Sequence, residues 1–216
     1  MKDILLFDLD GTLTDSQEGI TRCVEYALND QGITVSDRST LLPYIGPPLI
    51  DSFQHYHGMT RAQAERAVAK YRERYADVGL FENRLYPGIL DLLRAMNDAG
   101  KRCFVATCKP ESYSIRIADR FGITPYVERV CGATLDGKIL TKEAVVRYAL
   151  ACAGDPELSR VHMIGDRSND VVGSRACGVD CTYVLYGFGS REEAEAHHAA
   201  YILDTVDELK QHLLAL

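Results

Sequence analysis

Short apolar segments alternate with amphipathic helical segments from residue 87 to the end of the chain. The apolar segments are too short for core helices and are typical of buried strands. We expect strands at 102–106, 127–132, 161–165, 182–186 and 201–203, and helices at 89–99, 111–121, 142–153, 168–176, 190–197 and 206–214. Repeated alternation predicts a doubly wound α/β fold, in which a parallel sheet carries helices on both faces. Such sheets bind their ligands at the carboxyl ends of the strands.

The chain begins with another apolar run, at residues 4–7, that leads into a group of polar residues. Asp8 and Asp10 point to the same face of a strand, and crowded carboxylates need a cation or a shared proton to relieve their repulsion. Gly11 permits a sharp turn with its N–H near an anion, and Thr12 adds a hydroxyl donor. A strand that ends in an ordinary Asp-Gly turn is the simpler alternative. The order of strand, acids, glycine and hydroxyl favours a functional site.

Residues 16–80 follow a different pattern, which is helical throughout and contains no convincing strand. The expected helices cover 16–29, 39–44, 48–55 and 61–77. Glycines that follow the first and third of these segments predict where the helices end, and Thr60 predicts an N-cap for the last. The chain therefore contains a helical region between its first strand and the α/β pattern.

Two later strand ends carry polar side chains that would lie at the same edge of the sheet as Asp8. Thr107 ends one strand just before a helix, whose N–H groups could help to bind an anion. Asp166 and Asp170 follow another strand, and Lys142 lies in the first turn of a helix, where a cation opposes the helix dipole. The simpler alternatives are a threonine cap for Thr107 and an Asx turn for the two acids.

Composition excludes several classes of partner. The 216 residues are 46% hydrophobic and carry a net charge of −7, which disfavours nucleic acid and anionic membranes. No apolar stretch approaches the roughly 20 residues that span a bilayer, and the first apolar run is too short for a signal peptide. Seven cysteines, an odd number without a CxxC pair, favour reduced thiols and a cytoplasmic location.

Four groups of polar residues follow one another along the chain: Asp8-Leu9-Asp10-Gly11-Thr12, Thr107, Lys142 and the run Gly165-Asp166-Arg167-Ser168-Asn169-Asp170. They resemble the four ordered motifs of the haloacid dehalogenase-like (HAD) superfamily. The resemblance implies a Rossmann-like catalytic core from residues 1–15 and 82–216, with an inserted α-helical cap at 16–81. The runs at 45–49, 106–110 and 185–190 resemble the phosphoglycolate phosphatase-like group, and within it the 5′-nucleotidase-like branch.

The resemblance also implies catalytic roles. Asp8 would be the nucleophile that forms an aspartyl-phosphate. Asp10 would protonate the leaving alcohol and then deprotonate the water that hydrolyses the intermediate. Thr107 and Lys142 would hold the phosphoryl oxygens.

The implied cofactor is Mg²⁺, which prefers oxygen ligands and takes few of them from the protein. Asp8, the main-chain carbonyl of Asp10, and Asp166 are the expected ligands. Asp170 is expected at the same metal site, where it would orient the loop of Asp166 or a bound water.

Substrate contacts are expected from Gly11 and Thr12, from Cys108 and Lys109 in the second motif, and from Gly46 in the cap. Gln17 and Arg22 are further cap candidates for contact with the leaving group. Simpler alternatives remain for these residues: Lys109 could pair with a neighbouring acid, and Gly46 could merely belong to a Pro-Pro loop.

The expected function is Mg²⁺-dependent hydrolysis of small phosphorylated metabolites, with phosphoglycolate and 5′-nucleotides as leading substrates. Asp10 argues against dehalogenation, because a carbon–halogen bond needs no acid for its leaving group. A phosphomutase and a non-catalytic regulator that binds phosphate or a partner are the alternatives. The expected partner is a small metabolite rather than a nucleic-acid polymer or a membrane, and the expected assembly is a monomer or a homodimer.

Overall fold

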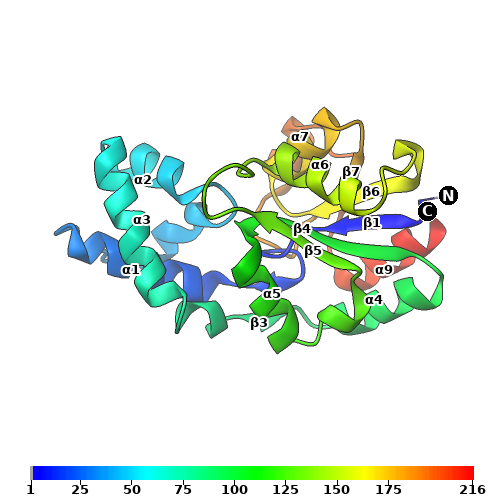
Figure 1. The fold of residues 1–216 in the computed structure, drawn as a ribbon, viewed down its shortest axis with the longest axis horizontal. Coiled ribbons are helices and arrows are strands. Elements are labelled where there is room, and N and C mark those ends of the chain that lie inside the picture. The colour runs from blue at the N-terminus through cyan, green and yellow to red at the C-terminus, as the bar shows by residue number, and fades with distance from the viewer. Residues whose placement is uncertain (1) are drawn as a thin grey trace. The chain divides into compact units, whose positions relative to one another are not determined.

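A computed structural model describes residues 2–216 and contains two compact units (Figure 1). One unit holds the chain up to Thr14 and again from Leu85 onward. The other unit holds the segment Asp15–Arg84.

The first unit is built on a six-stranded parallel sheet with the strand order β5-β4-β1-β6-β7-β8. Its central strand, β1, pairs with β4 on one side and β6 on the other. The strands are β1 (Ile4–Phe7), β4 (Arg102–Pro110), β5 (Arg129–Ala133), β6 (Val161–Gly165), β7 (Asp180–Val184) and β8 (Tyr201–Leu203). The predicted parallel α/β fold is confirmed.

Helices cover both faces of this sheet. Figure 1 shows α6 and α7 on one face and α4, α5 and α9 on the other. The helices are α4 (Ile89–Asp98), α5 (Glu111–Arg120), α6 (Lys142–Cys152), α7 (Ser168–Ala176), α8 (Arg191–Ala196) and α9 (Val206–Ala215), with single 3₁₀ turns at η3 (Thr124–Tyr126) and η4 (Leu158–Arg160).

The strands are apolar without interruption because both faces of the sheet are covered. Every side chain of β1 and β6 is buried, and so is most of β4. On one face of the sheet, α6 packs its residues Val145, Val146 and Ala149 in a core that also contains Met163 and Cys181 of the strands. Each Å² of apolar surface that is buried stabilises the fold by about 25 cal/mol. The buried strands therefore hold their ends, and the residues that follow them, in fixed positions.

The second unit is helical, as the sequence predicts. It contains α1 (Gln17–Asp30), η1 (Arg38–Tyr44), α2 (Leu49–His57), α3 (Arg61–Tyr75) and η2 (Gly79–Phe81). The apolar stripe of α1 is buried against α3, η1 and η2. Thr60 caps α3 with a reciprocal capping box, and Gly58 ends α2 in the left-handed conformation at φ 60°.

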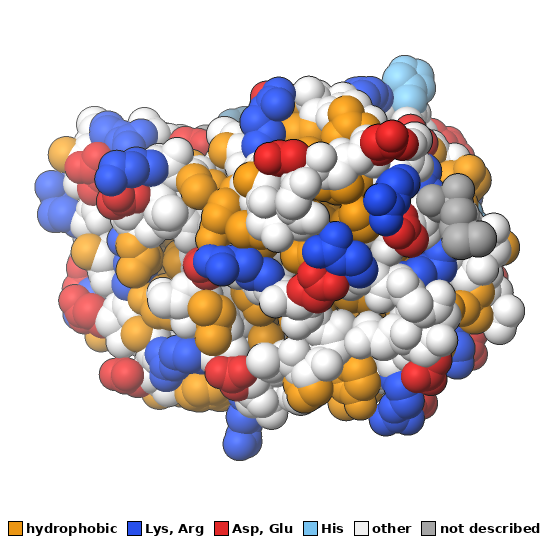
Figure 2. Space-filling view, turned by 45° about the vertical axis from the view of Figure 1, so that its right-hand side comes forward, with side chains coloured by type: hydrophobic (Ala, Val, Ile, Leu, Met, Phe, Trp, Pro, Cys, Tyr) orange, Lys and Arg blue, Asp and Glu red, His pale blue; other side chains and the backbone are white. Residues whose placement is uncertain are grey.

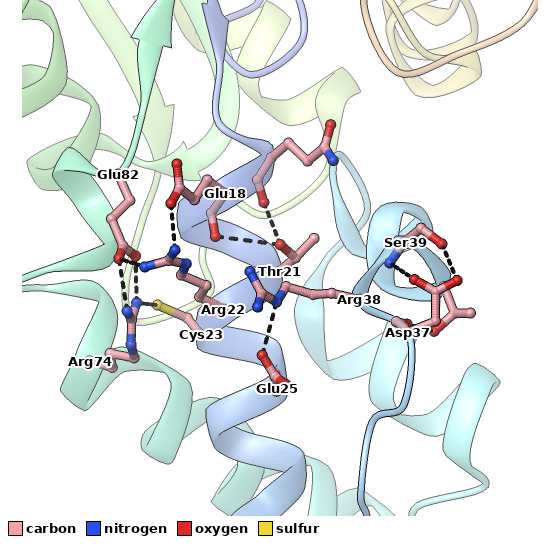
Figure 3. A network of polar contacts seen from close by, with 12 residues as sticks. Glu18, Thr21, Arg22, Cys23, Glu25, Asp37, Arg38, Ser39, Arg74 and Glu82 are labelled. Atoms are coloured by element: carbon pink, nitrogen blue, oxygen red, sulfur yellow. Dashed lines mark hydrogen bonds and ion pairs between the residues drawn. The ribbon is translucent and has the colours of Figure 1, made fainter.

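A network of ion pairs ties together the elements of the helical unit (Figure 3). Glu82 accepts two hydrogen bonds from Arg74 of α3, at 2.6 and 2.9 Å, and one of 2.9 Å from Arg22 of α1. The main-chain carbonyl of Glu82 also accepts the N–H of Gly19 at 2.9 Å. These bonds connect both ends of the helical segment through one residue, Glu82.

The chain passes between the two units through β2 (Thr14–Asp15) and β3 (Arg84–Leu85), which pair as a two-stranded sheet. The sequence does not reveal these strands, because two residues are too few for an alternating pattern.

Candidate active site

Polar side chains gather at the carboxyl edge of the sheet in the first unit. Asp8 and Asp166 directly follow β1 and β6, and Thr107 lies within β4. All three side chains are buried. The adjacency of β4, β1 and β6 brings these residues together although they are far apart in the chain.

Lys142, the first residue of α6, connects the carboxylates of this group. Its Nζ donates to Asp8 Oδ1 at 2.7 Å and to the carbonyl of Ala106 at 3.0 Å. It also lies 2.7 Å from Asp170 Oδ1. The Lys142 side chain is only 5% exposed, so its ammonium group is held by these partners rather than by water.

Burial and crowding govern the protonation of the group. Burial, opposed by Lys142 and aided by Asp170 and Asp10, raises the pKa of Asp8 to about 6. Burial, and then the charges of Asp170 and Asp8, raise the pKa of Asp166 well above its usual range. Although burial lowers the pKa of Lys142, Asp170 and Asp8 raise it well above its ordinary value, so the lysine stays charged.

The carboxylates of Asp8, Asp166 and Asp170 fit a divalent cation. One oxygen from each lies within 4.8 Å of the others, and all three residues are buried. Three carboxylates and one ammonium leave an excess of two negative charges when all are ionised. Asp170 Oδ1 accepts no hydrogen bond of good geometry despite its burial. An all-oxygen donor set with this charge suits Mg²⁺ better than a soft transition metal.

Asp170 also contacts the loop that carries Asp166. Its Oδ2 accepts the main-chain N–H of Arg167 at 3.1 Å. A Cβ at Gly165 would lie 2.2 Å from Asp170 Cγ, so only glycine leaves room for this carboxyl group. The sequence-based expectation gave Asp170 this orienting role, which stays a prediction.

Asp10 forms a second buried ion pair, with Lys109 of β4. Lys109 Nζ contacts both carboxylate oxygens of Asp10, and the two side chains are 6% and 11% exposed. Lys109 thus pairs with a neighbouring acid, which is the simpler of the two alternatives expected for it. The structure therefore places Lys109 beside the expected acid–base residue, and direct contact with substrate stays a prediction.

The remaining candidates of the first and second motifs have partners of their own. Gly11 turns the chain at φ 84°, and the Thr12 hydroxyl donates to Asp166 Oδ1 at 3.4 Å. Thr107 Oγ1 accepts the N–H of Lys109 at 3.2 Å. Burial raises the pKa of the Cys108 thiol to about 12, so it remains a neutral thiol at pH 7.

Sequence reasoning missed two contributors to the site. The main-chain N–H of Phe188 donates to Asp166 Oδ2 at 2.8 Å. Glu193 Oε1 accepts the N–H of Ser168 at 2.6 Å and the Nε of Arg167 at 3.2 Å. The sequence signal for the Phe188 N–H was the pair of glycines that flank Phe188 just after a strand end. No sequence signal indicated Glu193.

The cap candidates belong to the helical unit. Gly46 lies between η1 and α2 at φ 106°, and Arg22 is held by Glu18 and Glu82. Gln17 borders a polar pocket of about 370 Å³ within this unit. The pocket is lined by Asp15, Gln17, Glu18, Thr21, Arg38, Ser39, Glu82, Asn83 and Arg84. A role for these residues in contacting the leaving group stays a prediction.

Comparison with known proteins identifies the family. The model of the haloacid dehalogenase-like hydrolase family matches residues 5–184, which include the buried acidic group and Lys142. The chain belongs to the haloacid dehalogenase-like hydrolases. A solved structure described as a predicted phosphatase from Clostridium acetobutylicum is 42% identical, with a TM-score of 0.97 over 100% of both chains.

Curated relatives of this HAD chain carry several names. A 5′-nucleotidase of Pseudomonas aeruginosa is 42% identical over 97% of this chain and 94% of its own length. The tyrosine-protein kinase PtkA of Mycobacterium tuberculosis is 37% identical over 97% of this chain and 72% of its own. Phosphoglycolate phosphatase 1 of P. aeruginosa is 26% identical over 95% and 78%. The family, the 5′-nucleotidase and the phosphoglycolate phosphatase support a phosphatase.

Proposed function

We propose that this HAD phosphatase hydrolyses small phosphate monoesters in a Mg²⁺-dependent reaction that passes through an aspartyl-phosphate on Asp8. The observation that carries the proposal is the buried contact of Lys142 with Asp8 and Asp170 at the edge of the sheet. A protein that only bound a partner would gain nothing from burying these charges, since burial of ion pairs is seldom stabilising.

In the first half of the reaction, an Asp8 carboxylate oxygen forms a bond to phosphorus while the bond from phosphorus to the leaving oxygen breaks. Lys142 and the Thr107 hydroxyl neutralise charge on the transferred phosphoryl oxygens. In the second half, water attacks the phosphorylated Asp8, which releases inorganic phosphate and restores the carboxylate. Because Lys142 Nζ contacts Asp8 Oδ1, its positive charge lies beside the transferred phosphoryl group in both halves.

Asp10 moves the proton in both halves. It gives a proton to the leaving alcohol and later takes one from the attacking water, so the enzyme returns to its starting state. Lys109 holds both oxygens of Asp10 and fixes the direction of the carboxyl group. Lys109 is thus a positioning residue for the acid–base step.

The residues that would hold Mg²⁺ are Asp8, Asp166 and the main-chain carbonyl of Asp10, with Asp170 beside them. When bound, the ion supplies positive charge that allows an anionic nucleophile to approach an anionic phosphoryl group. Two excess negative charges in the buried group match the charge of one such ion.

We infer that 5′-nucleotides are the leading substrates and phosphoglycolate the second. The 42% identical relative named 5′-nucleotidase supports the first, and the more distant phosphoglycolate phosphatase supports the second. Acidic and basic side chains are interspersed on the face shown in Figure 2, which supports a small ligand over a nucleic-acid polymer. Among residues 2–216, no helix has the length and hydrophobicity needed to cross a membrane. The odd number of cysteines supports a cytoplasmic location.

The test is phosphate release from a panel of 5′-nucleotides, sugar phosphates and phosphoglycolate, with Mg²⁺ and with a chelator. Asp8→Asn is the site variant, and Asp98→Asn, at an exposed position of α4, is the matched control. We expect release that needs Mg²⁺, survives in Asp98→Asn and disappears in Asp8→Asn. No release from any compound by the wild type would contradict the proposal.

A second function is favoured by the relatives named tyrosine-protein kinase PtkA, which cover 97% of this chain. The same nucleophile could pass a phosphoryl group to a tyrosine hydroxyl instead of to water. To distinguish the two functions, a second experiment supplies the protein with ATP and a tyrosine-containing protein. Transfer to tyrosine without hydrolysis of any small monoester would replace the phosphatase proposal with this one.

A further inference from the structure

A loop at residues 185–190 packs against both Asp166 and the first motif. It follows β7, whose carboxyl end lies at the same edge of the sheet as the active-site group. The carboxylate of Asp166 is fully buried and accepts the Phe188 N–H at Oδ2 and the Thr12 hydroxyl at Oδ1. One bond comes from the loop and the other from the first motif.

Two glycines of the loop allow this packing. A Cβ at Gly187 would lie 2.4 Å from Asp166 Cβ and 2.4 Å from the carbonyl of Gly11. A Cβ at Gly189 would lie 2.1 Å from the main-chain carbonyl of Asp166. All three distances are far below van der Waals contact, so the loop can approach Asp166 this closely only where side chains are absent.

Tyr186 holds the loop to the first motif. Its hydroxyl donates to the main-chain carbonyl of Thr12 at 3.0 Å. Its ring packs edge-on against the ring of Tyr86, with centroids 5.0 Å apart. The loop is therefore fixed at Tyr186 by a hydrogen bond and an aromatic contact, two residues before the N–H that reaches Asp166.

We propose that residues 185–190 form a positioning clamp that fixes the rotamer of Asp166 and thereby sets the affinity of the site for Mg²⁺. The Phe188 N–H holds Oδ2, so the carboxylate cannot rotate away from the group formed with Asp8 and Asp170. Hydrogen bonds to ligating carboxylates typically account for 10- to 100-fold in metal affinity. The inference rests on the proposed function, in which Asp166 is a ligand of Mg²⁺.

The test measures Mg²⁺ binding by calorimetry without substrate, and the Mg²⁺ concentration that gives half-maximal phosphate release. Phe188→Pro removes the N–H and should weaken Mg²⁺ binding by about 10- to 100-fold. Activity should recover at saturating Mg²⁺, whereas a merely structural defect would lower the maximal rate at every Mg²⁺ concentration. Unchanged affinity in a folded Phe188→Pro variant would overturn the clamp.

Tyr186→Phe keeps the main chain intact, and so tests the clamp even if the proline variant fails to fold. Loss of one neutral hydrogen bond should weaken Mg²⁺ binding by about fivefold. Tyr201→Phe, on β8, is the matched control and should bind Mg²⁺ as the wild type does. Wild-type affinity in Tyr186→Phe, or equal losses in both tyrosine variants, would overturn the proposal.

The outcomes separate this inference from the proposed function. A wild type that binds Mg²⁺ but releases no phosphate, with weakened binding in Tyr186→Phe, would support the clamp and contradict the phosphatase. Metal-dependent hydrolysis with equal Mg²⁺ affinities in all variants would support the phosphatase and overturn the clamp.

Discussion

The two units use ion pairs in opposite ways. In the α/β unit, Lys142, Asp8 and Asp170 form an ionic group whose side chains are at most 8% exposed. In the helical unit, the corresponding network joins Glu82 to Arg74 and Arg22, with exposures from 17% to 41%. The first group carries excess negative charge, while in the second Glu82 lies between two guanidinium groups, one of which also pairs with Glu18.

Under the proposed function, the first ionic group serves chemistry, whereas the second stabilises the fold. Burial of charge is costly, and a buried ion pair is often less stable than apolar residues of the same volume. A half-exposed guanidinium–carboxylate network loses less hydration and gains well-directed hydrogen bonds. The α/β unit thus maintains an arrangement that folding alone does not favour, and the helical unit maintains one that it does.

The largest expected effect comes from removing the central cation of the α/β unit. Lys142→Met leaves Asp8 and Asp170 buried without their partner, and should lower the free energy of unfolding by about 3–5 kcal/mol. Phosphate release should fall by at least about 10²- to 10³-fold, because the variant lacks the positive charge that neutralises the phosphoryl oxygens. Urea denaturation and steady-state kinetics measure both quantities.

His162 is a second buried ionisable group of the α/β unit. Because it has no proposed catalytic role, it tests the effect of burial by itself. Burial, together with Lys2, His212 and Lys101, lowers the pKa of His162 from 6.5 to about 4, although Asp180 opposes the shift. The unfolded chain therefore binds the proton more tightly, so stability is full above about pH 6.5 and is lost as the pH falls toward 4.

Wild type should lose about 2 kcal/mol more stability between pH 7 and pH 5 than a His162→Asn variant. Denaturation at both pH values measures the difference. Equal pH dependence in the two proteins would show that His162 does not remain neutral in the folded state.

In the helical unit, Glu82→Gln removes the charge from the carboxylate that joins α1 and α3. The hydrogen bonds from Arg74 lower the pKa of Glu82, as does Arg22, although burial opposes them. We expect a loss of about 1–3 kcal/mol, the usual value for hydrogen bonds to a charged group. A larger loss than that of Lys142→Met would break the proposed contrast between the two units.

The smallest effect is expected from an ion pair on the surface of α3. Arg61 and Glu65 are 64% and 56% exposed, in an i,i+4 arrangement. Glu65→Gln should change the free energy of unfolding by less than about 0.5 kcal/mol. This variant supplies the baseline for Glu82→Gln, and similar losses in both would show that the Glu82 network is not structurally important.

The elements of the fold could be predicted because strand–helix alternation is a local property of the sequence. β6, α7 and β8 coincide with the predicted ranges 161–165, 168–176 and 201–203. β4 does not, because it continues past the predicted end at 106 to Pro110, where it pairs with Ala133 of β5. Pairing between distant strands decides such boundaries, and no local pattern reports it.

The candidate site was predictable to the same extent. Strand ends and spacing placed Asp8, Thr107 and Asp166 at one edge of the sheet, where the structure has them. The clamp was not predictable, because the donor at Phe188 is a main-chain N–H and carries no side-chain signature. The ion pair of Lys109 with Asp10 was one of two alternatives, and only the side-chain geometry distinguishes them.

The most direct measurement compares the activity and the stability of one variant, Asp8→Asn. We infer that Asp8 serves catalysis and that its buried charge destabilises the fold. Phosphate release should fall by about 10⁴-fold or more, because the nucleophile is lost. The free energy of unfolding should stay the same or increase, because the buried group loses one negative charge. A variant that retains phosphate release, or that loses as much stability as Lys142→Met, would contradict the account.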